Sequence, residues 1–285
     1  MLSNPIAGCM RWGIWGANYS STEVEKMITH CVEAGITSFD HADIYGHYTT
    51  EALFGNALKG LPGFRNQIQL ISKCGIQMVS NNRPNNSIKS YNTSAIHIIQ
   101  SVENSLTALH TDYLDVLLIH RPSPLLQPTE VAEAVCQLKQ SGKIRSFGVS
   151  NFNPLQMEAL RKCCEINFNQ LEVSLMHVNA LQDGTLDYCI ANRIQAMAWS
   201  PLGGNPTAEK TPVLQNALNN LANKYETDVA TIMLAWLYKL PSAIIPVTGS
   251  SNAERIIAAK NAQLVNLSNE EWFILWKAAT GNEIP

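Results

Sequence analysis

Residues that could perform acid–base chemistry recur where apolar segments of this 285-residue chain end. The first three are a carboxylate, an ammonium and an imidazole, in Asp40, Lys73 and His120. A single buried lysine or aspartate is usually a satisfied structural group. Several at the same end of successive strands favour an active site, because functional groups of a barrel enzyme converge at the carboxyl ends of its strands. Later segments carry further hydrogen-bonding or small residues at or near their ends, in Ser150-Asn151, Gln170, Ser200 and Gly249-Ser250.

The elements that would position these residues alternate regularly. Eight short, mostly apolar segments are predicted to be buried strands. They are Met10–Trp15, Gly35–Asp40, Ile68–Lys73, Leu114–His120, Ile144–Asn151, Phe168–Val173, Ile194–Ser200 and Ala243–Thr248. Helical sequence follows each of them, and this alternation predicts parallel strands with helices packed outside. We therefore predict an α/β fold, a (β/α)8 TIM barrel forming a single domain over residues 1–285.

Helices are predicted from apolar spacing and from capping residues. The first runs over Thr22–Glu33, with Thr22 and Glu25 as its capping box. The others include Asn92–His110, with Ile96 among its inward residues, a helix opening at Asn153-Pro154, and an extra C-terminal helix over about Ser268–Thr280. The polar stretch Gln77–Asn92 is the longest loop, and it is either a substrate lid or a plain solvated loop.

Seven short motifs occur in a fixed order along the chain. They are DHADIYG (40–46), ISK (71–73), LIHRP (118–122), GVSNF (148–152), NQ (169–170), WSPL (199–202) and IPVTGS (245–250). In these motifs and their order, over about Arg11 to Ile256, the chain resembles the aldo-keto reductases. The resemblance implies an NADPH-dependent oxidoreductase that reduces small aldehydes or ketones to alcohols by hydride transfer.

The resemblance also implies four catalytic residues, whose roles fit their chemistry. Tyr45 is expected to give a proton to the carbonyl oxygen. A free tyrosine is a weak acid with a pKa near 10, and the ammonium of Lys73 is expected to lower that pKa. Asp40 would pair with Lys73 and hold it in place, while His120 would orient the carbonyl by a hydrogen bond.

The cofactor site has no G-x-G-x-x-G motif, but residues 249–255 look like the start of an anion-binding helix. By the resemblance, Ser250 and Arg255 would hold the 2′-phosphate of NADPH, and Trp199 would stack on the nicotinamide. The remaining expected contacts fall into three groups. They are Ser150, Asn151 and Gln170 at the carboxamide, Ser200, Leu202, Gly203 and Gly204 along the pyrophosphate, and Ile14, Trp15 and Asp40 at the ribose. Gly249 replaces a lysine that some members carry, so weaker use of NADH stays open.

The composition of the chain limits the kinds of partner that the protein is expected to bind. With 20 Lys+Arg against 23 Asp+Glu, the net charge of −3 excludes a large basic field for nucleic acid or an anionic membrane. The seven cysteines contain no C-x-x-C pair, and the amino terminus does not look like a signal peptide, so we expect a cytoplasmic protein. No metal site is predicted, because His41 and His47 lack further ligands at suitable spacing, and a monomer is expected.

Two other functions stay open at this stage. The resembled family also includes nicotinamide-binding regulatory or channel-associated subunits with little turnover. A metal-dependent barrel hydrolase would need more histidines at strand ends than His120 alone. Four loops are expected to determine the substrate, and they are Trp12–Tyr19, Gln77–Asn92, Arg121–Pro128 and Gly203–Pro212.

Overall fold

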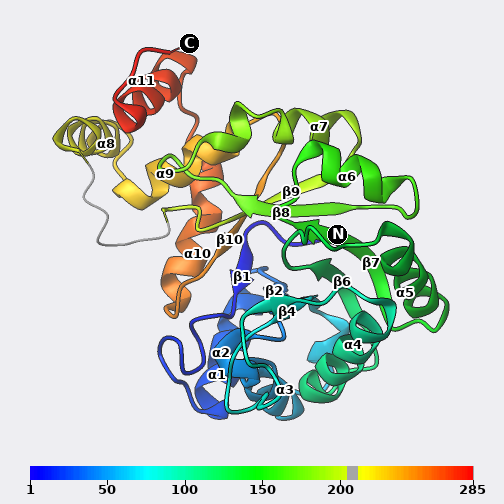
Figure 1. Cartoon of the computed structure of the whole chain (residues 1–285). Coiled ribbons are helices and arrows are strands. Elements are labelled where there is room, and N and C mark those ends of the chain that lie inside the picture. Colours follow the sequence, from blue (N-terminus) through cyan, green and yellow to red (C-terminus); the bar gives the residue numbers. More distant parts are fainter. Residues whose placement is uncertain (204–210, 285) are drawn as a thin grey trace.

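The computed structural model describes residues 1–203 and 211–284, and its centre is a closed barrel of eight parallel strands (Figure 1). Around the barrel the strands follow the order β1-β10-β9-β8-β7-β6-β3-β2. They are β1 (Ile6–Gly8), β2 (Ser38–Asp40), β3 (Gln69–Cys74), β6 (Leu114–Ile119), β7 (Ile144–Ser150), β8 (Phe168–Glu172), β9 (Gln195–Trp199) and β10 (Ile245–Thr248). The predicted (β/α)8 barrel is confirmed. Gly204 and most of the expected loop 203–212 lie outside the described residues.

The helices cover the outside of the barrel. They are α1 (Ser21–Glu33), α2 (Tyr45–Tyr48), α3 (Thr50–Lys59), α4 (Ala95–Leu109), α5 (Pro128–Gln140), α6 (Pro154–Arg161), α7 (Thr185–Ala191), α8 (Pro212–Lys224), α9 (Val229–Tyr238), α10 (Ala253–Asn261) and α11 (Asn269–Thr280). Helix α6 begins as predicted, because Asn153 and Gln156 form a capping box and Pro154 stands at the first helical position.

The register of the strands brings their carboxyl ends to one level. Asp40 pairs with Gly8 on one side and Ile71 on the other, and Ser150 pairs with Gln170. Beneath this level the barrel is filled by buried apolar side chains. They are Ile6, Ile71, Val116, Leu118, Met197, Ile245 and Val247. The polar residues at the strand ends therefore lie above a packed core, not in an open channel.

Two local predictions near the amino terminus were wrong. The first strand is Ile6–Gly8, while residues 10–16 form turns in which the backbone N–H of Gly16 donates to the carbonyl of Gly13 at 3.0 Å. The two tryptophans of that segment suggested a strand, but its glycines favour turns. The capping box of α1 is Ser20 with Glu23, two residues earlier than predicted.

The inward face of helix α4 was predicted correctly at Leu106 and Leu109 but not at Ile96, and the loop before the helix is partly ordered. Ile96 is 83% exposed, whereas Ile98 and Val102 are buried. The predicted loop 77–92 begins and ends in a small antiparallel pair, β4 (Ile76–Gln77) with β5 (Ser90–Tyr91). This pair fixes the two ends of the loop to each other beside the barrel.

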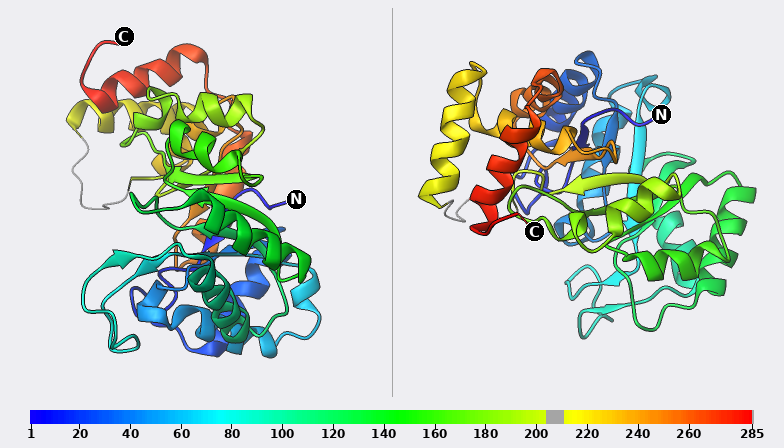
Figure 2. Two further views of the ribbon diagram at one scale, coloured as in Figure 1. Left: turned by 45° about the vertical axis from the view of Figure 1, so that its right-hand side comes forward. Right: turned by 90° about the horizontal axis from the view of Figure 1, so that it is seen from above.

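The C-terminal helix α11 lies beside α8 at one end of the molecule (Figure 2). Trp272 of α11 stacks on the buried Trp236 of α9, with ring centroids 4.8 Å apart and an angle of 3° between the planes. Each indole N–H donates to the other residue's backbone carbonyl, at 3.1 and 2.9 Å. These contacts attach the extra helix to the barrel through a satisfied aromatic pair.

Candidate active site

The ammonium of Lys73 is the centre of the polar cluster above the barrel core. Its Nζ donates to Asp40 Oδ2 at 2.6 Å, to the carbonyl of His41 at 2.8 Å and to the hydroxyl of Tyr45 at 3.1 Å. Lys73 and Asp40 are 1% and 2% exposed. All three N–H groups of the lysine are used, so its position is fixed. The structure thus brings together Asp40 from β2, Lys73 from β3 and Tyr45 from the start of α2.

A tight left-handed turn places Tyr45 beside Lys73. Gly46, His47 and Tyr48 have φ values of 57°, 56° and 69°. A Cβ at Gly46 would approach Thr50 Oγ1 to 2.5 Å, so only glycine fits at that position. Two non-glycine residues in this conformation store strain of the kind that is found at functional sites.

Aromatic rings surround the phenol of Tyr45. The ring of Trp15 lies 6.2 Å away, and the imidazole of His120 meets it edge-to-face at 6.0 Å. His120 follows directly after β6, and its Nδ1 is buried without a hydrogen-bond partner in the described part of the chain. The four expected catalytic residues therefore lie in one cluster.

The pKa values of this cluster differ from the expectation at one residue. Burial raises the pKa of Tyr45 above 10, and the opposing effect of Lys73 is smaller. The expected net lowering is therefore wrong, because desolvation of the phenolate dominates. Burial lowers the pKa of Lys73, but Asp40 and Tyr45 raise it by more, so the net change is upward. At neutral pH the phenol is protonated and the amine is an ammonium.

His120 is a neutral imidazole at neutral pH. Burial, followed by the charges of Lys73, Arg121 and Lys89, holds the pKa of its ring well below 6.5. A neutral imidazole has one N–H to donate and one nitrogen that accepts. His120 is thus suited to hydrogen-bond an oxygen rather than to carry a charge.

The residues expected around the nicotinamide form a connected network beside this cluster. Trp199 Nε1 donates to Asn151 Oδ1 at 2.9 Å, and Asn151 Nδ2 donates to Ser150 Oγ at 2.8 Å. Gln170 Nε2 donates to Asp40 Oδ1 at 2.8 Å, which links the network to Lys73. Asn151 and Ser200 have φ values of 62° and 50°, so both follow their strands in a strained conformation.

The segment expected at the 2′-phosphate starts helix α10. Trp12 Nε1 donates to the carbonyl of Ser250 at 3.0 Å, and the hydroxyl of Tyr19 donates to the carbonyl of Ser251. Asn252 caps the helix through the backbone N–H of Arg255 at 3.1 Å. A Cβ added at Gly249 would meet nothing within 4 Å, so there is open space at this point.

The outer cofactor candidates are exposed. Ile14 and Leu202 are 53% and 41% exposed, and Arg255 is exposed as well. Gly203 has a φ of 88°, and Trp15 is half-buried against Tyr45 and His47. These residues have space on one side for a ligand, whereas Ser150 and Gln170 are buried.

Sequence reasoning missed several contacts of the cluster. The His41 carbonyl and the Gln170 amide hold Lys73 and Asp40, respectively, while the fully buried ring of His41 packs edge-on against Phe54. Glu51 is also buried, and it accepts from Ser72 Oγ at 2.5 Å. The sequence does not show that Glu51 is buried, so it does not reveal this contact. Once the burial is known, the carboxylate is expected to have a hydrogen-bond partner.

Over residues 1–203 and 211–284, no group of three or more His, Cys, Asp or Glu side chains is arranged to hold a metal ion. Among the helices of that same part of the chain, none has both the length and the apolar content needed to span a bilayer.

The barrel therefore carries a buried Asp–Lys–Tyr cluster and a neutral histidine at the carboxyl ends of its strands. The model of the Aldo/keto reductase family matches residues 6–279, and the chain belongs to that family. It is therefore an oxidoreductase of the aldo-keto reductase type.

Similar proteins cover nearly the whole chain. The uncharacterized oxidoreductase YcsN of Bacillus subtilis is 45% identical over 99% of this chain and 96% of its own length. A 6-dehydroglucose reductase of Agrobacterium fabrum is 38% identical over 96% and 94% of the two chains. An aldo/keto reductase of Klebsiella pneumoniae, solved with NADP and acetate, has a TM-score of 0.78 at 26% identity and covers 96% and 90% of the two chains.

Proposed function

We propose that this protein reduces small aldehydes or ketones to alcohols with NADPH, using Tyr45 as the proton donor. The observation that carries the proposal is the position of Lys73 Nζ, which contacts both Asp40 Oδ2 at 2.6 Å and the Tyr45 hydroxyl at 3.1 Å. A phenol that stays protonated at neutral pH is a proton source. An ammonium beside it stabilises the phenolate that is left after the proton moves.

His120 and Asp40 support this transfer. The neutral ring of His120, edge-on to Tyr45, donates a hydrogen bond to the substrate's carbonyl oxygen and so places that oxygen near the phenol. Asp40 holds Lys73 in place and is itself held by Gln170. In this arrangement Tyr45 and His120 act on the substrate directly, whereas Lys73 acts on Tyr45, and Asp40 on Lys73.

The residues present fit a bound NADPH, which supplies the hydride. Ser150, Asn151 and Gln170 present amide and hydroxyl groups suited to a carboxamide, and the indole of Trp199 is available for stacking. The open space at Gly249 and the start of α10 suit a phosphate, with Arg255 one turn away. The Klebsiella pneumoniae neighbour, which was solved with NADP, supports the same choice. NADH is proposed as a weaker alternative.

The substrate class is proposed to be polar, hydroxylated carbonyl compounds. The guanidinium carbon of Arg121 lies 5.5 Å from the Trp199 ring, and His47 lies 5.3 Å from Trp15, so polar groups stand at the mouth. The relative named 6-dehydroglucose reductase supports a sugar-derived aldehyde. We propose that the protein acts as a cytoplasmic monomer without nucleic-acid or membrane partners.

The proposed function is tested by titration followed by turnover. NADPH should quench the emission of Trp199 and Trp15 in a saturable manner, and NADH should do so more weakly. Loss of NADPH absorbance in the presence of glyceraldehyde and other hydroxylated aldehydes should then report turnover. Tight NADPH binding without turnover on any aldehyde or ketone would favour the regulatory-subunit alternative. If neither NADPH nor NADH binds, both the reductase function and the regulatory-subunit alternative are contradicted.

Replacing Arg255 by alanine is expected to weaken NADPH binding by roughly 1.5–3 kcal/mol, the value for a hydrogen bond to a charged group. NADH binding should change little, because NADH has no 2′-phosphate. The comparison needs dissociation constants for both cofactors, with Arg255→Lys as the variant that keeps the charge. Equal weakening of NADPH and NADH by Arg255→Ala would show that Arg255 does not contact the 2′-phosphate.

A further inference from the structure

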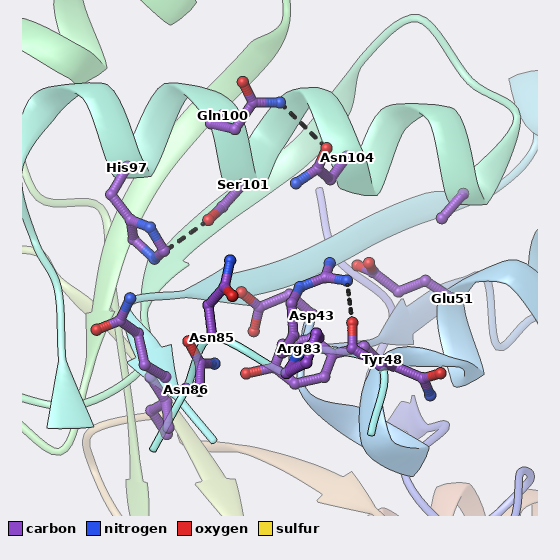
Figure 3. A pocket seen from close by; sticks show the side chains of 15 residues that line it. Asp43, Tyr48, Glu51, Arg83, Asn85, Asn86, His97, Gln100, Ser101 and Asn104 are labelled. Atoms are coloured by element: carbon purple, nitrogen blue, oxygen red, sulfur yellow. Dashed lines mark hydrogen bonds between the residues drawn. The ribbon is translucent and has the colours of Figure 1, made fainter. Parts of the chain in front are cut away.

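A cavity of about 320 Å³ lies beside the barrel, between helix α4 and the loop after β3 (Figure 3). Neither Tyr45, Lys73 nor His120 is among the residues that line it. Its wall is formed from α4, from residues 82–86 of the loop and from the segment around α2 and α3. We call this cavity the amide pocket, because six of its fifteen lining residues carry a carboxamide, and they are Gln77, Asn82, Asn85, Asn86, Gln100 and Asn104.

One wall of the amide pocket is a polar stripe on α4. His97, Gln100, Ser101 and Asn104 are spaced three, four and seven residues from the first, so they share one face of the helix. Gln100 Nε2 donates to Asn104 Oδ1 at 3.1 Å, and Ser101 Oγ lies 3.4 Å from His97 Nε2. Figure 3 shows His97 and Ser101 directed from α4 toward the loop, while Gln100 and Asn104 are exposed and lie further along the same helix. A helix that only packed against the loop would present apolar residues there.

The opposite wall comes from the sequence Asn82-Arg83-Pro84-Asn85-Asn86. Asn82 Nδ2 donates to the His47 carbonyl at 2.8 Å, and Asn86 Nδ2 donates to the Met78 carbonyl at 3.0 Å. The guanidinium carbon of Arg83 lies 4.6 Å from the Tyr48 ring. These contacts hold the wall in place. The Asn85 carboxamide makes no hydrogen bond in the part of the chain that the structure describes, so it is available to a ligand.

Two carboxylates line the inner side of the pocket. Asp43 Oδ1 is buried and has no hydrogen-bond partner within residues 1–203 and 211–284. Glu51, 6% exposed, is held by Ser72 Oγ. Burial, followed by the charge of Glu51, raises the pKa of Asp43 well above its ordinary value. A raised pKa favours the protonated carboxylic acid, whose O–H donates a hydrogen bond while its second oxygen accepts.

We propose that the amide pocket is a second binding site, separate from the barrel mouth, for a small polyhydroxylated molecule such as a sugar or a sugar alcohol. Carboxamides and carboxylates offer donors and acceptors in planar pairs, which match the adjacent hydroxyls of such a ligand. The pocket is of ordinary ligand-site size. The guanidinium of Arg83 disfavours a cation, and most of the other polar lining groups are uncharged carboxamides and hydroxyls, so a neutral polar ligand matches the pocket.

Occupancy of the amide pocket would join the loop to α4. Asn82 and Asn86 belong to the loop that leaves β3, the strand of Lys73, and Asn104 belongs to the helix. A ligand bonded to both walls therefore stabilises the loop beside the barrel. The proposed binding site does not depend on the chemistry at the barrel mouth. An experiment can therefore contradict the binding site without contradicting the proposed reductase function, and the reverse.

The test is a titration of the full chain with sorbitol and with myo-inositol, which have no carbonyl group. Nuclear magnetic resonance follows the side-chain amide signals of the asparagines. Signals of Asn85 and Asn104 should shift and saturate, whereas that of Asn151 at the barrel mouth should stay in place. Shifts at Asn151 alone, or no saturable shift with either polyol, would overturn the proposal. Saturable shifts with putrescine or Mg²⁺ but with neither polyol would overturn the ligand class.

A matched pair of exposed α4 variants tests the location. Asn104→Leu removes one carboxamide from the pocket wall and should weaken polyol binding about tenfold. Thr107→Leu places the same side chain one turn further along the helix, at a residue that does not line the pocket, and should bind as the native chain does. Asn85→Leu provides the same test from the loop. Equal affinity of the Asn104, Asn85 and Thr107 variants would contradict a site between these walls.

Discussion

Replacing Tyr45 by phenylalanine is expected to lower kcat for carbonyl reduction by about two to four orders of magnitude, the range for loss of a general acid. The phenyl ring keeps the packing against Trp15 and His120, so the dissociation constant for NADPH should stay nearly unchanged. Because burial keeps the pKa of Tyr45 above 10 and that of His120 below 6.5, the loss should be similar from about pH 7 to 9. Steady-state kinetics with one aldehyde at several pH values measure it.

Tyr48→Phe is the matched control for this variant. Tyr48 lies three residues further on, at the other end of α2, and its hydroxyl accepts from the backbone N–H of Met78 at 2.8 Å. Removing that hydroxyl disturbs the same turn and the loop, but not the contact with Lys73. A Tyr45→Phe enzyme with the native kcat, or a Tyr48→Phe enzyme with an equal loss, would show that the proton comes from another group.

The sequence was enough to predict the barrel because hydrophobic segments and helix signals alternate along it. Seven of the eight predicted strands overlap the observed strands, from Gly35–Asp40 to Ala243–Thr248. The first strand escaped detection because Ile6–Gly8 has only three residues and precedes a segment with two tryptophans. A strand this short is specified by its neighbours, since β2 and β10 pair with it on both sides.

The candidate site was only partly predictable. Asp40, Lys73 and His120 were found because they end apolar segments, but Tyr45 depends on the left-handed turn at Gly46 and was found only through the resemblance. The direction of its pKa shift was wrong, because the sequence shows the nearby ammonium but not the degree of burial.

The amide pocket could not have been predicted. Polar residues on one face of a helix normally indicate its solvent side, and a run of asparagines normally indicates a solvated loop. In this structure the stripe on α4 and the run at residues 82–86 line one cavity, although most of these side chains are also exposed. Only the fold reveals that two segments with ordinary surface composition enclose a cavity.

Replacing Lys73 by methionine is expected to lower the free energy of unfolding by about 3–5 kcal/mol, because it leaves a buried carboxylate unpaired. Asp40 is 2% exposed, and only the Gln170 amide would remain to hold it. Urea unfolding at neutral pH measures the change. Lys143→Met is the control, because its partner Glu103 is 39% exposed and surface pairs contribute at most about 1 kcal/mol.

The double variant Lys73→Met/Asp40→Asn separates the loss of the pair from the loss of packing. Asparagine keeps the shape of Asp40 without its charge, so the double variant should be more stable than Lys73→Met alone, and the two changes should not be additive. Additive losses would mean that the two groups do not interact in the folded chain. Such a result would also remove the physical basis for Asp40 holding Lys73 against Tyr45. Both the stability of the pair and the position of Lys73 depend on the same 2.6 Å contact between Lys73 Nζ and Asp40 Oδ2.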